Sequence, residues 1–381
     1  MKPFSLSLCL LILLLSACER EDRFGSALPV IFQIDQLQLR GGDTITITGN
    51  NFSENAANNR VTFNGTQALI VSSSFRDLVV IVPERAGAGQ LVVTTRAGRS
   101  NEFPYRYTYQ VTGVNTLDLN VEFTNFRKMK IINNQIFLIS TFNDPFPDPS
   151  FTKIYRFRLD GSAVPEGLNP LQINNFNVGA IAADAQGNVV VSEARLYSLN
   201  LLQGTLSPLP NTSKVLAVGG EYDPDFGPFS DITFDRDGFL YYITVNGFES
   251  DLATFSTQAG ESVITPILGE VVANFNITST KEVLLGYQFG LIASVSQQGQ
   301  FRLVFGGEGV LGGDAFSSIF RESTNEFFIA VDEKLFVLDR TTGRLENLAV
   351  LPQDIISLAL SEDGRLFALT EFSEVQEVIF K

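Results

Sequence analysis

The chain has 381 residues, of which 44% are hydrophobic and 18% charged, a composition typical of globular rather than disordered proteins. Acidic side chains outnumber basic ones by 42 to 27, which argues against nucleic acid as a partner. Histidine is absent, and this excludes Ser-His-Asp catalysis and metal sites built on imidazole. The length predicts two or more domains.

The first residues have the pattern of a targeting segment. Lys2 supplies a positive charge, Leu6 to Leu15 are mostly apolar, and small residues precede Cys18. The run Leu15-Ser16-Ala17-Cys18 resembles the lipobox of bacterial lipoproteins, which implies cleavage before Cys18 and lipidation of its thiol. We therefore expect residues 1–17 to be a lipoprotein signal peptide and residues 18–28 a lipidated tether. An ordinary secretory peptide with an incidental cysteine is the alternative.

The start of the tether is acidic, with the sequence Glu19-Arg20-Glu21-Asp22-Arg23. This segment is similar to the signal that exports lipoproteins of Bacteroidota to the outer face of the outer membrane. The resemblance implies a protein that is anchored in the cell outer membrane and exposed at the surface. A solvated tether with no export role is the alternative. Cys9 lies in the predicted signal peptide, so no intrachain disulfide is expected in the mature chain.

From Pro29 onward, short β-branched and aromatic segments alternate with turn residues, the pattern of strands in a small β-sandwich. Three landmarks follow in order: Gly41-Gly42-Asp43, Val61-x-Phe63-Asn64-Gly65 and Val80-x-Val82-Pro83. They resemble the landmarks of IPT/TIG domains. The resemblance implies an immunoglobulin-like sandwich over residues 29–109, which we interpret as a spacer between the anchor and the rest of the chain.

The remainder of the chain repeats a pair of hydrophobic strands. The first strand of the pair recurs as Ile136-Phe137-Leu138, Val189-Val190-Val191, Leu240-Tyr241-Tyr242, Val283-Leu284-Leu285, Phe327-Phe328-Ile329 and Leu366-Phe367-Ala368. A period of about 40–50 residues with several strands per unit indicates a β-propeller. The segment from Gly219 to Tyr241 is similar to an NHL repeat. We expect residues 114–381 to form a six-bladed NHL-like propeller, and the fold class to be all-β.

A propeller must close its ring, and the last predicted unit lacks an outer strand. The segment Leu117 to Phe123 alternates between apolar and polar residues just before the first unit. We expect this segment to supply the missing strand.

Three long connectors, Phe142 to Thr152, Asn211 to Phe229 and Gly306 to Phe316, are expected to open on one face of the propeller. Carboxylates accept hydrogen bonds from sugar hydroxyls, and aromatic rings stack on sugar faces. The predicted ligand-binding residues of these connectors are Asp144, Phe146, Asp148, Tyr222, Asp223, Asp225, Phe226 and Asp314, with Phe151 and Glu308 in the same segments. The alternative is that the polar residues serve the turns and the rings fill the core.

These patterns predict a surface lipoprotein that binds an extracellular ligand, a polysaccharide, through the propeller face. We expect no catalytic residues and no cofactor, although calcium on Asp144 with Asp148, or on Asp223 with Asp225, is left open. A protein-interaction scaffold that docks onto another envelope protein is the second hypothesis. The third is a metal-dependent hydrolase resembling the gluconolactonase and regucalcin group.

Overall fold

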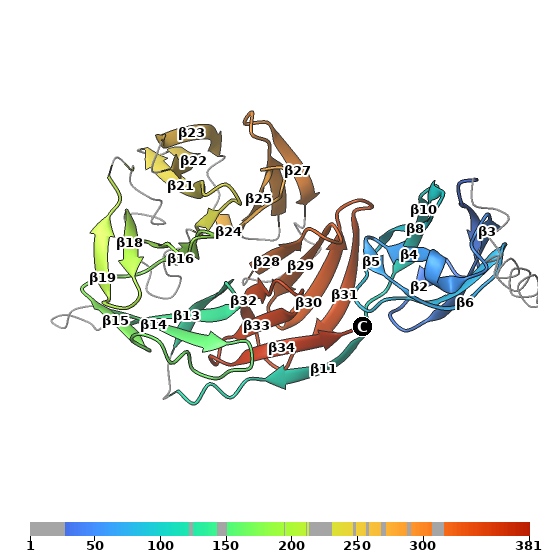
Figure 1. Ribbon diagram of the computed structural model, residues 1–381. Coiled ribbons are helices and arrows are strands. Elements are labelled where there is room, and N and C mark those ends of the chain that lie inside the picture. The colour runs from blue at the N-terminus through green and yellow to red at the C-terminus, as the bar shows by residue number, and fades with distance from the viewer. Residues whose placement is uncertain are drawn as a thin grey trace, which may run out of the picture. The chain divides into compact units, whose positions relative to one another are not determined.

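The computed structural model describes residues 27–121, 125–142, 151–193, 195–210, 212, 231–246, 249–256, 259–267, 272–287, 291–306 and 316–381. It contains two compact units, Met1–Gln110 with Lys381, and Val111–Phe380 (Figure 1). Regular structure in the described residues is β, apart from one short 3-10 helix, η1 (Ala56–Asn58). The predicted all-β class is confirmed. None of the described helices has the length and apolar character needed to span a membrane.

The first unit is a sandwich of two sheets. One has the order β1-β3-β7-β6, formed by β1 (Val30–Ile34), β3 (Thr44–Asn50), β7 (Asp77–Ile81) and β6 (Leu69–Ser73). The other has the order β2-β10-β8-β4-β5, formed by β2 (Gln38–Leu39), β10 (Phe103–Tyr107), β8 (Gly89–Thr95), β4 (Arg60–Phe63) and β5 (Thr66–Gln67), with β9 (Gly98–Arg99) paired to β8. This is the immunoglobulin-like arrangement that the sequence predicts.

Alternation along the strands builds the core of the sandwich. Ile45 and Ile47 of β3 are fully buried, whereas the alternating Thr44, Thr46 and Thr48 face outward. Val61 and Phe63 of β4 fill the core from the opposite sheet. The predicted Asn64-Gly65 turn joins β4 to β5 with φ values of 48° and 86°, a left-handed pair that favours these two residue types.

The described residues of the second unit form six four-stranded sheets. The first is β12 (Phe126–Ile132), β13 (Gln135–Phe142), β14 (Phe151–Arg158) and β15 (Leu171–Asn174), and the second is β16 (Ala180–Ala183), β17 (Val189–Ser192), β18 (Leu196–Asn200) and β19 (Thr205–Pro208). The third is β20 (Thr233–Phe234), β21 (Leu240–Asn246), β22 (Glu249–Ser256) and β23 (Gly260–Ile267), and the fourth is β24 (Val272–Ile277), β25 (Val283–Tyr287), β26 (Leu291–Val295) and β27 (Phe301–Gly306). The fifth is β28 (Phe316–Arg321), β29 (Glu326–Val331), β30 (Lys334–Asp339) and β31 (Arg344–Val350), and the sixth is β32 (Ile355–Leu360), β33 (Leu366–Thr370), β34 (Val375–Phe380) and β11 (Val111–Thr116).

The first strands of these sheets form a closed ring. In the order β12, β16, β20, β24, β28 and β32, each contacts the next, and β32 contacts β12 (Figure 1). We call these six the inner strands. A ring of radially arranged antiparallel sheets is a β-propeller, so this part of the fold prediction is confirmed.

The ring is closed by a different segment from the one expected. Strand β11 pairs antiparallel with β34, with Val114 opposite Val378, so the expectation that Leu117 to Phe123 forms the closing strand is wrong. Strand β11 lies at the outer edge and is largely exposed, so its sequence carries no hydrophobic alternation. Leu117 and Leu119 alternate because both are buried against Phe126 and Phe367, in the core between the last and the first sheet.

The hydrophobic runs that recur in the sequence are the second and third strands of each sheet. Every residue of β29 and of β33 is buried, because neighbouring sheets cover both faces of a central strand. Strands at the outer edge, such as β19 and β31, contain no buried residue and leave a weaker pattern in the sequence. The core therefore lies between adjacent sheets, in clusters that follow the ring.

Candidate functional site

The predicted ligand-binding residues Asp144, Phe146, Asp148, Tyr222, Asp223, Asp225, Phe226 and Asp314 lie outside the described residues, as do Glu308 and the predicted lipidation site Cys18. Phe151 is described and begins β14. The described strand ends on either side of the three connectors are informative. Because the strands of each sheet are antiparallel, the first and third strands begin at one face of the propeller. The second and fourth strands end at the same face. All three connectors leave and rejoin the sheets at this face, which we call the connector face.

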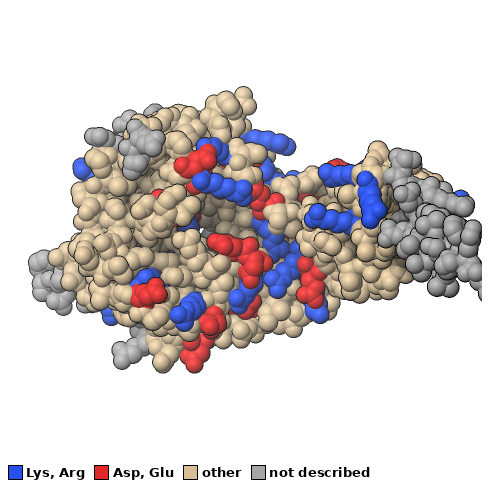
Figure 2. Space-filling view, viewed as in Figure 1, with Lys and Arg blue, Asp and Glu red and all other residues tan. Residues whose placement is uncertain are grey.

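The described part of the connector face carries further acidic and aromatic side chains. Phe372, in the turn between β33 and β34, has 64% of its surface exposed. The described acids in the turns and connectors of this face are Asp118, Glu193, Asp231, Asp332, Glu333, Asp354, Glu371 and Glu374. Figure 2 shows acidic and basic side chains gathered around the hollow that the sheets enclose.

The inner strands have the opposite charge character. Their charged residues are Arg127, Lys128 and Lys130 on β12 and Arg321 on β28, all of them basic in a chain of net charge −15. Arg321 has a structural role, because its guanidinium lies 4.5 Å from the ring centre of Phe328 and donates to the carbonyl oxygen of Gly364 at 3.0 Å. The basic residues of β12 are therefore the ones to explain.

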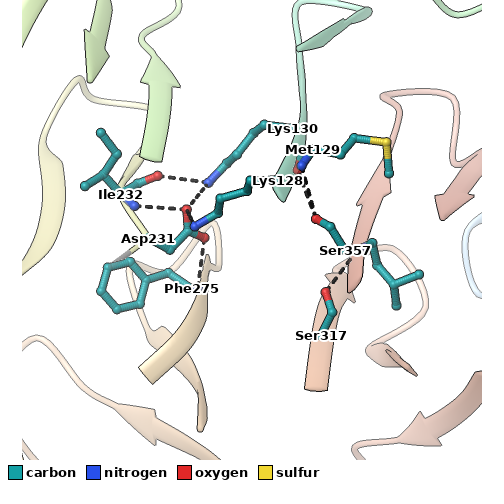
Figure 3. A network of polar contacts seen from close by, with 9 residues as sticks. Lys128, Met129, Lys130, Asp231, Ile232, Phe275, Ser317 and Ser357 are labelled. Carbon is teal, nitrogen blue, oxygen red and sulfur yellow. Dashed lines mark hydrogen bonds and ion pairs between the residues drawn. The ribbon is translucent and has the colours of Figure 1, made fainter. Parts of the chain in front are cut away.

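Lys128 and Lys130 meet one carboxylate, that of Asp231, just before β20 (Figure 3). The Nζ atom of Lys130 donates to Oδ1 of Asp231 at 2.8 Å and to the carbonyl oxygen of Ile232 at 2.9 Å. The Nζ atom of Lys128 lies 3.4 Å from the same Oδ1. The side chains of Lys128, Lys130 and Asp231 are 19%, 22% and 5% exposed. We call these three residues the axial cluster.

Local strand geometry sets the two lysines in place. Met129 packs into the core between the last and first sheets, so its neighbours Lys128 and Lys130 project from the other face of β12. A register irregularity between Phe126 and Lys128 shifts the alternation there. Without it, alternation along β12 would place Lys128 and Lys130 on the same face as Phe126, which is fully buried.

The carboxylate of Asp231 is held from several directions. Its Oδ1 accepts from the backbone N–H of Ile232 at 3.0 Å, and its Oδ2 accepts from the N–H of Phe275 on β24 at 3.2 Å. Burial by itself raises the pKa of Asp231, but Lys128, Lys130 and the hydrogen bonds outweigh it and lower the pKa to about 2. Burial lowers the pKa of Lys128, and the attraction of Asp231 offsets this only in part.

A series of side-chain bridges links consecutive inner strands, and Asp231 is one of them. Asn276 accepts from the N–H of Phe320 at 3.0 Å, and the hydroxyl of Ser317 accepts from the N–H of Leu358 at 3.0 Å. Ser357 donates to the carbonyl oxygen of Met129 at 3.2 Å (Figure 3). Neutral side chains make these three bridges, so joining the sheets does not require a charge at Asp231 or two lysines beside it.

The sequence carries a signal for this site, on a strand and not on the connectors that were predicted to bind the ligand. Three basic residues occupy four positions at Arg127-Lys128-Met129-Lys130, at the start of the first repeat of an acidic chain. Their partner Asp231 could not be assigned, because 101 residues separate it from Lys130.

A second charged group lies on the opposite face of the propeller. Lys281 contacts Asp237 at 2.5 Å and Asp235 at 3.4 Å, and the hydroxyl of Tyr241 lies 3.4 Å from Asp235. The hydrogen bond to Asp237 raises the pKa of Lys281, and burial raises that of Tyr241 to about 12. Among the described residues, no three His, Cys, Asp or Glu side chains are grouped so as to hold a metal ion.

Comparison with known proteins identifies the first unit. Residues 29–111 match the IPT/TIG domain family. The IPT/TIG domain predicted over residues 29–109 is confirmed, and the match covers the sandwich alone. No curated protein matches the chain in sequence.

Solved structures support the fold of the whole chain. A structural genomics protein of unknown function from Bacteroides thetaiotaomicron is similar, with a TM-score of 0.55 and 10% identity over 93% of this chain and 98% of that one. A gluconolactonase from Xanthomonas campestris has a TM-score of 0.51 and 11% identity over 71% of this chain and 90% of its own. An auxiliary nutrient binding protein from Bacteroides thetaiotaomicron has a TM-score of 0.46 and 12% identity, over 93% and 98% of the two chains. At such identities the first two of these matches support a shared fold and nothing more.

Proposed function

We propose that the chain is a surface lipoprotein of the cell outer membrane whose propeller binds an extracellular polysaccharide at the connector face. The observation that carries the binding role is the axial cluster. Its three ionised groups are largely withdrawn from water, although neutral side chains make the equivalent bridges elsewhere in the ring. Withdrawing charges from water costs free energy, so an excess of them in a hollow favours a functional role over a structural one.

The choice of a polysaccharide rests on the side chains of the connector face. The predicted residues Asp144, Tyr222 and Phe226 combine carboxylates with aromatic rings, and Phe372 adds an exposed ring to the same face. Carboxylates accept hydrogen bonds from sugar hydroxyls, while rings cover the apolar faces of sugars. Anchoring at the cell surface rests on Cys18 and the acidic residues after it.

A glycan array tests the binding role. The purified full-length chain in detergent is compared with the variants Tyr222→Ala/Phe226→Ala and Phe372→Ala. Leu202→Ala serves as the control, because Leu202 is an exposed apolar residue in the turn between β18 and β19, on the opposite face. We expect the control to bind as the unmodified chain does, and the aromatic variants to lose most of the signal. A chain that binds no carbohydrate of the array would overturn the proposal.

Anchoring is tested separately. Cys18→Ser is expected to abolish incorporation of labelled palmitate and to release the chain from the membrane fraction. Protease added to intact cells is expected to digest the unmodified chain, and resistance to the protease would rule out display at the surface.

An exposed apolar face on the sandwich favours one second candidate, docking onto an envelope protein. On the outer face of the β1-β3-β7-β6 sheet, Leu69 is 66% exposed and lies opposite Ile81, with Val30 exposed on the same sheet. Crosslinking in intact cells, comparing the unmodified chain with Leu69→Ser, tests it. Docking predicts one stoichiometric partner that the variant loses, and a chain with no such partner argues against this role.

A further inference from the structure

We propose that the axial cluster is a binding site for a single carboxylate group of the ligand, such as that of a uronic acid residue in a glycan, held by the ammonium groups of Lys128 and Lys130. The identity of the glycan rests on the proposed function. The anion site itself depends only on the geometry of the cluster.

Hydrogen-bond accounting gives the first argument. A lysine ammonium has three donors. Lys130 uses two of them, on Asp231 and on the carbonyl oxygen of Ile232. Among the described residues Lys128 contacts one acceptor, Oδ1 of Asp231 at 3.4 Å, and that oxygen already accepts from Lys130 and from the N–H of Ile232. Oδ1 of Asp231 can accept from only one of the three Lys128 donors, so the others have no acceptor among the described residues, and a ligand oxygen would supply one.

The charge balance gives the second argument. Among the described residues, two lysines face one carboxylate and none of the inner strands contributes an acid, so these residues together carry a surplus positive charge. The low pKa of Asp231 keeps it ionised at neutral pH, so it balances one of the two lysines and leaves the other without a counter-charge. One added carboxylate makes the cluster neutral. Opposite charges in a site of reduced dielectric attract more strongly than the same charges at the surface.

The acidic residues around the axial cluster favour a ligand with a single carboxylate over a polyanion. The connector face carries Glu193, Asp354 and Glu371, and the chain as a whole has a net charge of −15. These acids repel a densely charged polymer as it approaches. At physiological ionic strength their effect fades beyond about 8 Å, whereas the two lysines act at contact distance. An oligosaccharide with one acidic residue therefore fits better than a polysulfated chain.

Calorimetry with the full-length chain in detergent tests the site. The probes are galacturonate, neutral galactose, an oligogalactoside ending in one galacturonate, and heparin. The variants are Lys128→Gln and the control Lys334→Gln, which removes a lysine from the connector face outside the cluster. Lys128 is chosen over Lys130 because its contact with Asp231 is the longer of the two, 3.4 Å against 2.8 Å. An unchanged melting temperature verifies that the variant is folded.

We expect galacturonate and the acidic oligosaccharide to bind at least about tenfold more tightly than their neutral counterparts, and Lys128→Gln to lose that preference. We expect Lys334→Gln to retain the preference for the acidic sugars, and heparin to bind no better than the neutral sugar. Bound carboxylate favours the charged form of Lys128, so binding takes up a proton where Lys128 is partly neutral. The affinity then falls as pH rises through the pKa of Lys128, where Asp231 and Lys130 are the charged groups that face it.

Two outcomes overturn the inference: equal binding of galacturonate and galactose, or a preference for galacturonate that survives in Lys128→Gln. The test separates this inference from the proposed function. If glycans bind equally well with and without a carboxylate, the proposed function holds and the anion site is contradicted. If free galacturonate binds in a Lys128-dependent way but no oligosaccharide binds, the anion site is supported and the polysaccharide is contradicted as the ligand.

Discussion

The two ends of strand β20 carry aspartates that look alike and are used in opposite ways. Asp231 precedes the strand and Asp235 follows it, and both are buried and close to lysine. Asp235 shares one lysine with Asp237, so negative charge is in excess, whereas Asp231 faces two lysines and positive charge is in excess. Asp235 also accepts from the N–H groups of Asp237 and Phe239, both at 2.9 Å, and so completes its own turn.

Asp235 therefore has a local role within its own turn, whereas Asp231 has a role in tertiary structure. The carboxylate at Asp235 satisfies backbone donors two and four residues away, as short polar side chains in turns commonly do. The carboxylate at Asp231 joins parts of the first, third and fourth sheets and neutralises charge from across the ring. Substitutions of Asp231 and Asp235 should therefore change the free energy of unfolding by different amounts, and these changes should depend differently on pH.

The largest effect is expected from Asp231→Asn. Asparagine keeps an acceptor for the backbone but leaves Lys128 and Lys130 together without a counter-charge, so we expect the free energy of unfolding to fall by about 3 kcal/mol. Asp235→Asn keeps the acceptor for its turn and should cost about 1 kcal/mol. Urea unfolding of both variants measures the difference, and equal losses would remove the contrast drawn between the two aspartates.

A second effect appears on acidification. The pKa of Asp231 is about 2 in the folded chain, against about 3.9 in an unfolded one. A lowered carboxyl pKa stabilises the fold above the unfolded value, and the contribution of about 3 kcal/mol is lost as pH falls from about 4 through 2. Unfolding free energies of the unmodified chain and of Asp231→Asn should therefore converge in this window. Parallel curves would show that the carboxylate is not linked in this way.

The two lysines should respond differently to replacement by methionine. Lys130→Met removes two hydrogen bonds and the closest counter-charge of Asp231, so a loss of about 2 kcal/mol is expected. Lys128→Met removes a desolvated charge that repels Lys130, so stability should stay the same or rise by about 0.5 kcal/mol. Thermal unfolding of the pair distinguishes them, and a larger loss at Lys128 would assign it a structural role.

The smallest effect is expected from Lys281→Met at the turn cluster. An ion pair that water reaches contributes little to stability, and added salt should reduce even this small difference. Unfolding in low and high salt measures it. A salt-independent loss as large as that of Asp231→Asn would show that this cluster is as important to the fold as the axial one.

Much of the architecture was predictable because it depends on short-range patterns. The paired hydrophobic runs were recognisable since central strands are buried on both faces, as in β29 and β33. The closing strand was misplaced because β11 is an exposed edge strand whose backbone does the pairing, which leaves its sequence without a pattern. The ligand-binding residues predicted on the three connectors, Asp144 and Tyr222 among them, remain predictions.

The sequence by itself determined where the buried central strands lie, that a turn follows a strand at Asn64-Gly65, and that the first domain is an IPT/TIG sandwich. All three depend on neighbours within a few positions of one another, through the alternation of side chains and the turn preferences of Asn, Asp and Gly. Only the tertiary structure decided that Val111–Thr116 closes the ring and that Lys130 meets Asp231, 101 residues away. Contacts of that kind arise when the ring closes, because closure brings distant strand ends together at one axis without leaving a periodic trace in the chain.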